Sequence, residues 1–222
     1  MEVQIAMNYY FKPIGVLPMP MPIMPINLSP KMLLLFGCML FGLLLGFIYN
    51  RHDKNNEWQI TDTLNLIIPM LASGALFLMF GISMISLKGL IFLFLLLIAS
   101  NSDFKNREVT DWIPLAIAIT GLIGTRLVDI PFMLIAMLII ALPQLLIAML
   151  KPGGYGGADI KLMAACSFLL GIEGGFIAII VGLSVGLLAT VIKRKLKKEN
   201  LKEKFPIVPC LAFGSFLAFI II

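Results

Sequence analysis

The sequence predicts an all-α, polytopic membrane protein with about eight transmembrane helices (six to eight). Hydrophobic residues make up 60% of the chain, charged residues only 13%, and mean hydropathy is +1.02. An ordinary soluble domain is about 45–50% apolar. Apolar runs of about 17–21 residues recur along the chain, a length typical of membrane-spanning helices. Strands of a membrane barrel would alternate in polarity, and these runs do not.

Eight segments are long or apolar enough to be candidate spans. In chain order they are 32–49, 64–81, 85–100, 112–125, 130–150, 159–171, 174–192 and 205–222. The sixth is short, because thirteen residues of helix rise only about 20 Å against a hydrocarbon core of about 30 Å. It either tilts or places Asp159 below the headgroups.

We divide the chain into a Pro- and Met-rich segment, residues 1–31, and a transmembrane domain, residues 32–222. Six prolines in the first 30 residues favour polyproline II or coil over helix. This segment lacks the basic start and uninterrupted apolar core of a secretory signal. It has no assigned role.

The basic residues predict the orientation. Segment 193–204 holds seven of the 17 Lys and Arg, and the other loops on its side bring that side's total to 13, against four opposite. Basic loops stay in the cytoplasm, so both termini are expected outside. The net charge of +5 suggests contact with anionic lipid and not with nucleic acid.

Two aspartates at the ends of apolar segments are the candidate catalytic residues. Asp103 and Asp159 are separated by two predicted spans, so both are expected at the cytoplasmic face. An acid at the edge of a bilayer is costly and usually functional. Two carboxylates brought together are the working parts of an aspartic protease.

The residue types give little support for a metal or cofactor site. Cys38, Cys166 and Cys210 lie in apolar sequence, and His52 is the sole histidine, so a four-ligand zinc site is not available. We therefore expect no metal and no cofactor. Glycine pairs 42/46 and 182/186 have the spacing of close helix packing, which we read as internal packing. The oligomeric state is left open.

Three segments resemble the type IV prepilin peptidases, membrane aspartyl proteases with a Gly-x-Gly-Asp motif. The first is 102–112, SDFKNREVTDW, in which Asp103 ends a helix and Asp111 precedes the next. The second is GGADIKL, which contains Gly156, Gly157, Ala158, Asp159 and Lys161. The third is FPIVPCLAFG, which contains Pro206 and Pro209.

The resemblance implies cleavage of the basic leader peptide from prepilin-like proteins at the cytoplasmic face of the cell membrane. Asp103 and Asp159 would be catalytic, with Gly156, Gly157, Ala158, Lys161, Asp111, Pro206 and Pro209 as supporting motif residues. The substrate would carry a basic leader and an apolar helix lying in the bilayer. Ala158 replaces the motif's second glycine.

The loop after the first predicted span departs from the family's full-length form. Full-length members carry a domain with paired cysteines there, whereas residues 50–63 form a short cysteine-free stretch. We therefore expect cleavage without N-methylation.

Two alternatives remain open at this stage. A presenilin- or signal-peptide-peptidase-like protease would usually have Tyr before the first aspartate, where this chain has Ser102. A transporter using carboxylates for protons or cations would be expected to place ionisable residues at mid-span or to repeat its halves.

Overall fold

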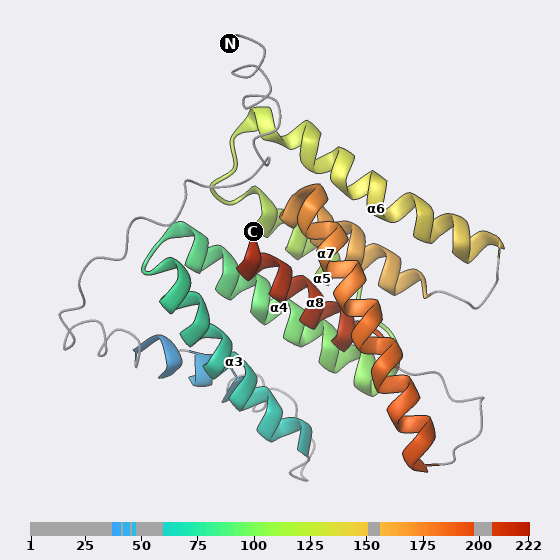
Figure 1. Cartoon of the computed structure of the whole chain (residues 1–222). Helices are drawn as coiled ribbons and strands as arrows, with labels where there is room; N and C mark the ends of the chain where they lie inside the picture. Colours follow the sequence, from blue (N-terminus) through green and yellow to red (C-terminus); the bar gives the residue numbers. More distant parts are fainter. Residues whose placement is uncertain (1–36, 41, 45, 48–59, 151–155, 198–205) are drawn as a thin grey trace, which may run out of the picture. The chain divides into compact units, whose positions relative to one another are not determined.

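The structure, a computed structural model, describes residues 37–40, 42–44, 46–47, 60–150, 156–197 and 206–222. In these residues the secondary structure is helical, without strands. The elements are α3 (Ile60–Phe80), α4 (Met84–Asn106), α5 (Trp112–Leu122), the 3-10 helix η1 (Leu127–Asp129), α6 (Ile130–Leu150), α7 (Gly157–Lys197) and α8 (Val208–Ile221) (Figure 1). The predicted all-α fold is confirmed.

The expected spans from Leu64 onward each have a helix in the structure. Three stretches are long and apolar enough to cross a membrane, namely Met84–Phe104, Leu127–Leu150 and Gly157–Ile192. Three shorter apolar helices accompany them in the described residues, namely Asn65–Phe80, Trp112–Leu122 and Val208–Ile221. The first expected span, 32–49, is described only in part, and residues 1–31 lie outside the described residues.

The chain divides into two compact units, Met19–Leu97 and a second that includes Ile98–Ile222. In the first unit, α3 packs closely against helical residues near Gly42 and Gly46. A β-carbon added at Gly46 would collide with the backbone oxygen of Asn65, and one at Gly42 would collide with that of Pro69. Ser73 Oγ also donates a hydrogen bond to the Cys38 carbonyl, at 3.0 Å. This glycine pair therefore serves internal packing, as predicted.

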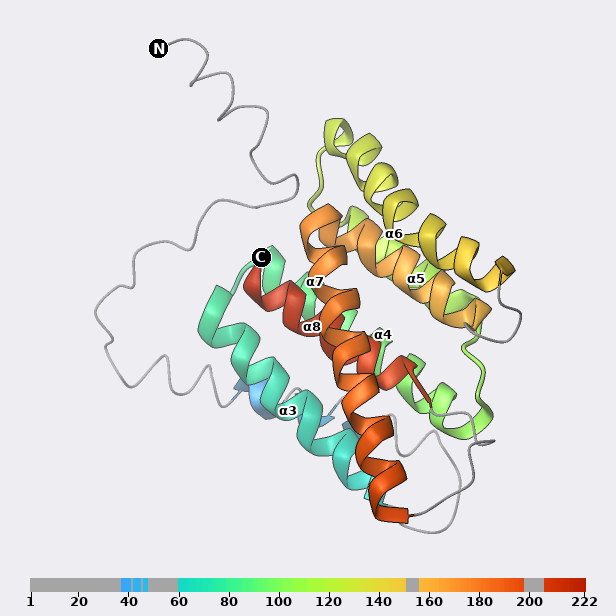
Figure 2. The ribbon, with the colours of Figure 1, turned by 45° about the vertical axis from the view of Figure 1, so that its right-hand side comes forward.

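In the second unit α7 is the central element, packing against α5, α6 and α8. It is two helices separated by a sharp turn at Gly171, whose φ of 76° and ψ of −175° are not helical. The reversal is visible in two views (Figures 1 and 2). Positive φ costs glycine little, which explains the residue at this point. The sequence had predicted two spans here, 159–171 and 174–192.

The two halves of α7 pack against each other. A β-carbon added at Gly175 would lie 2.8 Å from Ser167 Oγ. Eight residues along a straight helix span about 12 Å, so this approach requires the reversal at Gly171. The turn returns the chain toward the side of the unit from which α7 began.

Glycines also bring the second half of α7 against α8. A β-carbon at Gly214 would lie 2.6 Å from the backbone nitrogen of Gly182, and one at Gly182 would lie 2.9 Å from the α-carbon of Leu211. At Gly186 the nearest atom would be the β-carbon of Cys210, at 3.7 Å. The 182/186 pair therefore also serves internal packing, and it fixes the position of the beginning of α8.

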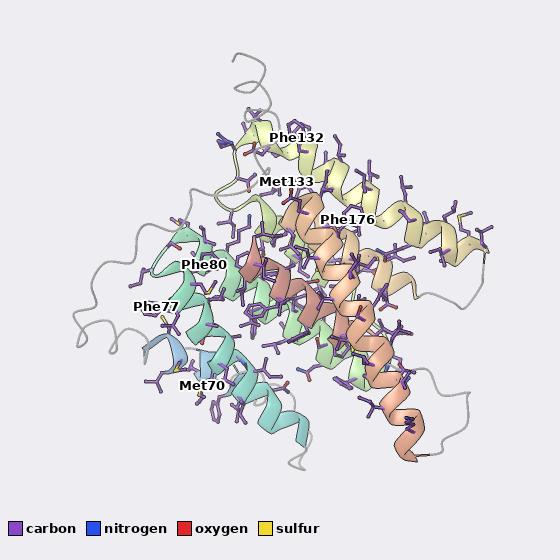
Figure 3. The ribbon with its side chains drawn as sticks, in the orientation of Figure 1. Met70, Phe77, Phe80, Phe132, Met133 and Phe176 are labelled. Carbon is purple, nitrogen blue, oxygen red and sulfur yellow. The ribbon has the colours of Figure 1, made fainter. Side chains whose placement is uncertain are left out.

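The outer surface of α6 is apolar and exposed. Its buried residues are Met133, Ala136, Ile140 and Gln144, which mark one face of the helix. Leu138, Leu142 and Leu146 are exposed, and side chains project away from the ribbon along its length, with Phe132 near its beginning (Figure 3). A helix with an apolar outer face suits a lipid environment.

Candidate active site

Asp103 lies in the last turn of α4 and is buried, with 8% of its surface exposed. Its carbonyl oxygen accepts a hydrogen bond from the Arg107 amide at 3.1 Å. Arg107 has a φ of 57°, the left-handed conformation that commonly ends helices. Ser102 Oγ donates to the Glu108 carbonyl at 2.6 Å and closes the turn. Local contacts thus end α4 just after its aspartate.

Asp159 occupies the third position of α7 and has 9% of its surface exposed. Its carboxylate accepts a hydrogen bond from the Gly156 amide, which precedes the helix. An acidic residue at the third position that bonds back to the capping amide is one half of a capping box. The start of α7 therefore orients this carboxylate.

The glycines of the motif have different surroundings. A β-carbon at Gly156 would lie 2.7 Å from Asp159 Oδ2, so the carboxylate depends on the absence of a side chain there. At Gly157 an added β-carbon would meet no atom within 4 Å. Ala158 is half-buried. Of the two glycines, Gly156 is therefore the one at which a side chain would collide with Asp159.

The fold brings Asp103 and Asp159 together, close enough for their charges to interact. They come from the end of α4 and the beginning of α7, with α5 and α6 between them in the chain. Two neighbouring buried carboxylates cannot both ionise easily, and a carboxylate pair that shares one proton is the working arrangement of aspartic proteases. Such a pair can accept a proton on one side while donating one on the other.

The beginning of α8 contributes a third element to the site. The Val208 amide donates a hydrogen bond to Asp103 Oδ2 at 3.2 Å, across 105 residues of sequence. Val208 is fully buried and is the first residue of α8. Pro209 follows it within the first turn, and Pro206 lies half-buried just before the helix. The Cys210 thiol is close enough to be affected by the charge on Asp103.

Asp111 and Lys161 form an ion pair beside this site and do not join the buried pair. Lys161 Nζ lies 2.6 Å from Asp111 Oδ1, and the two side chains are 59% and 79% exposed, respectively. Exposed ion pairs contribute about 0.2–1 kcal/mol, so this contact links α5 to α7 without dominating their packing. The supporting roles expected of Asp111 and Lys161 remain predictions.

Sequence reasoning missed the Val208 amide. Every residue except proline has a backbone N–H group, so the residue type does not reveal that this one donates to the site. Its acceptor also lies on another helix. The available signal was Pro209, because proline is favoured in the first turn of a helix and so marks where α8 begins. Among the described residues, no group of three or more His, Cys, Asp or Glu could hold a metal ion.

These features define a class of protein: an all-helical membrane protein with two buried, interacting aspartates at helix ends. The model of the type IV leader peptidase family matches residues 90–191, a segment that contains both aspartates. This match, together with a relative of the same kind, supports the resemblance to the type IV prepilin peptidases that the motifs predicted.

That relative is the prepilin leader peptidase/N-methyltransferase of Bacillus subtilis (strain 168). The identity is 30% over an alignment of 160 residues, and the alignment covers 64% of this chain and 58% of the relative. The chain therefore spans less than two thirds of the relative's length. No solved structure matched the chain.

Proposed function

We propose that this protein is a membrane aspartic endopeptidase that removes the basic leader from prepilin-like proteins at the cytoplasmic face of the cell membrane. The observation that carries the proposal is the meeting of Asp103 and Asp159, buried and interacting, inside the segment that matches the family model. Neither aspartate has a basic side chain hydrogen-bonded to it among the described contacts, which leaves the pair available for proton transfer.

In the proposed reaction the ionised carboxylate of the pair takes a proton from water as the water oxygen attacks the scissile carbonyl carbon. The protonated carboxyl donates its proton to the carbonyl oxygen, which gives a tetrahedral intermediate. When the intermediate collapses, one of its hydroxyl groups gives its proton to the ionised carboxylate as the C–N bond breaks. The leaving amine takes a proton from the other carboxyl, so the pair again holds one proton. General acid–base catalysis of this kind typically contributes about 10²–10⁴ in rate.

The proposed orientation rests on the distribution of basic residues, 13 on the side of both aspartates and four opposite. A prepilin-like substrate has its leader in the cytoplasm and its apolar helix in the bilayer. The exposed apolar face of α6, including Leu138, Leu142 and Leu146, suits the lipid surroundings that such a substrate shares. Site and scissile bond would then lie at the same membrane boundary.

We also propose that the reaction stops at cleavage. The relative from Bacillus subtilis carries N-methyltransferase in its name. In this chain 14 residues, Asn50 to Thr63, follow the first expected span, and they contain no cysteine. Segments below about 40 residues seldom fold alone without metals or disulfides. Residues 50–59 lie outside the described residues.

The proposal is tested by cleavage of a prepilin with membranes containing the wild-type protein or the variants Asp103→Asn and Asp159→Asn. Each variant should lose about 100-fold or more in cleavage rate while remaining in the membrane at normal amounts, since each removes a proton-transfer group. Asp129→Asn is the matched control. That side chain pairs with Arg126 at 3.0 Å, in the loop between α5 and α6.

Wild-type rates in both Asp103→Asn and Asp159→Asn would contradict the mechanism. Loss of cleavage in Asp129→Asn as well would indicate a general effect of removing acids. A wild-type protein that leaves several prepilins uncut but cleaves within other transmembrane helices would favour a presenilin-like protease.

A further inference from the structure

The amide of Val208 is the first N–H group of α8, and it donates a hydrogen bond to the carboxylate of Asp103. The first four amides of a helix have no partner within that helix. Here Cys210 and Leu211 donate to the Ile207 carbonyl, and Pro209 has no N–H group. The Val208 amide is thus the donor that the beginning of α8 directs at the site.

The two aspartates differ in how a helix end supports them. Asp159 lies in the first turn of its own helix, where the partial positive charge of the N-terminus favours an anion. Asp103 lies in the last turn of α4, where the partial charge is negative and disfavours one. The N-terminus of α8 supplies to Asp103 the partial positive charge that the N-terminus of α7 supplies to Asp159.

The other groups around Asp103 do not provide the same directed contact. The Arg107 charge acts from an exposed side chain, the Cys210 thiol is neutral in its ordinary state, and Asp159 carries the same sign of charge. Lys161 is bonded to Asp111. The sequence of α6 has no charged residue. The buried N–H···O contact of 3.2 Å from Val208 is therefore the main feature that both orients Asp103 and stabilises its charge.

We propose that Val208 is a positioning residue whose backbone amide aims the Asp103 carboxylate at Asp159 and stabilises the ionised state of the pair. The inference rests on the proposed function of the site and extends it to α8, outside the segment that matches the family model. Pro206 and Pro209 restrict the backbone on either side of Val208. They hold the amide at the level of Asp103.

The test removes the N–H group of residue 208 while leaving α8 able to form. Val208→Pro deletes the N–H group at the first helical position, where proline is tolerated. Trp112→Pro is the matched control, because Trp112 is the first residue of α5. The residues before the two sites have similar backbone conformations, φ −91° and ψ −28° at Ile207 and φ −60° and ψ −22° at Asp111.

Two readouts are compared for each purified, detergent-solubilised variant. The first is the pH profile of kcat/KM for leader cleavage. The second is an infrared titration of the protonated carboxyl stretch, assigned to Asp103 by difference from Asp103→Asn. The second readout does not require cleavage, so it tests the inference even if the proposed function is wrong.

Val208→Pro should move the acid limb of the kcat/KM profile, and the Asp103 infrared midpoint, about one pH unit higher, because the ionised carboxylate loses a donor. Its rate at the optimum should fall about tenfold or more, as expected for a misplaced reacting group. Trp112→Pro should keep the wild-type acid limb and midpoint.

Unchanged midpoints in Val208→Pro, whatever its rate, would overturn the inference and leave α8 a purely structural role. If Val208→Pro does not accumulate in folded form, an ester linkage in place of the amide at residue 208 gives the same test. It removes the N–H group while keeping the valine side chain. Normal midpoints in the ester variant would likewise overturn the inference.

Discussion

Gly156 lies so close to Asp159 that a β-carbon at residue 156 would come within 2.7 Å of Asp159 Oδ2. The same glycine donates its amide to that carboxylate. A side chain here would collide with the carboxylate and force it to shift. The glycine immediately before α7 is therefore a requirement of the site geometry, whereas Gly157 faces open space.

Gly156→Ala should lower the cleavage rate by about 10- to 100-fold, because a displacement of about 1 Å can cost that much. Gly157→Ala, one residue away and of identical chemistry, should retain clearly more activity. Initial rates on the same prepilin, normalised to the amount of membrane-inserted protein, give the comparison. Equal losses in the two variants would show that helix propensity, not contact with Asp159, governs this motif.

The Asp111–Lys161 ion pair should make a modest contribution. Asp111→Asn is expected to retain substantial cleavage, because its side chain is 79% exposed and bonded to Lys161 at 2.6 Å. A double-mutant cycle with Lys161→Met should give a coupling energy of about 0.2–1 kcal/mol in thermal stability. Loss of cleavage in Asp111→Asn, with wild-type cleavage in Asp103→Asn, would mean that the first catalytic aspartate is Asp111.

Cleavage should not depend on a metal ion. The prediction follows from the residue types, since the chain offers three cysteines in apolar sequence and one histidine. Prepilin cleavage is measured after exhaustive treatment with EDTA and gel filtration, and the rate should match that of untreated enzyme. An EDTA-inactivated enzyme that recovers on addition of zinc would contradict the aspartyl mechanism.

The product of cleavage should carry an unmodified N-terminus. Purified protein, prepilin and S-adenosylmethionine are incubated together, and the mass of the mature pilin is measured. We expect the mass of the unmethylated chain, because residues 50–63 are too few for a second folded domain. The Bacillus subtilis relative serves as the comparison enzyme. A product heavier by one methyl group would require a methyl-donor site elsewhere in the chain.

The sequence by itself was sufficient for the helical class, because long apolar runs in a bilayer can satisfy their backbone only as helices. It also placed a break between the spans 159–171 and 174–192, which the structure locates at Gly171. Helix ends were less certain. The fourth span was expected to reach Thr125, but α5 ends at Leu122, with Ile123 extended and Gly124 at a φ of 72°.

The same sequence reasoning placed Asp103 and Asp159 on one face, since two spans between them return the chain to the same side. It could not show that their charges would interact, because that depends on how the end of α4 and the beginning of α7 pack. The catalytic roles of both residues remain predictions.

Only the tertiary structure decided which groups surround each aspartate. The Val208 amide reaches Asp103 across 105 residues, and Lys161 reaches Asp111 across 50. Apolar periodicity is a local property that fixes where helices form, whereas these contacts depend on helix packing. Close approach at Gly182 and Gly214 holds α8 against α7, and the start of α8 thereby meets the end of α4.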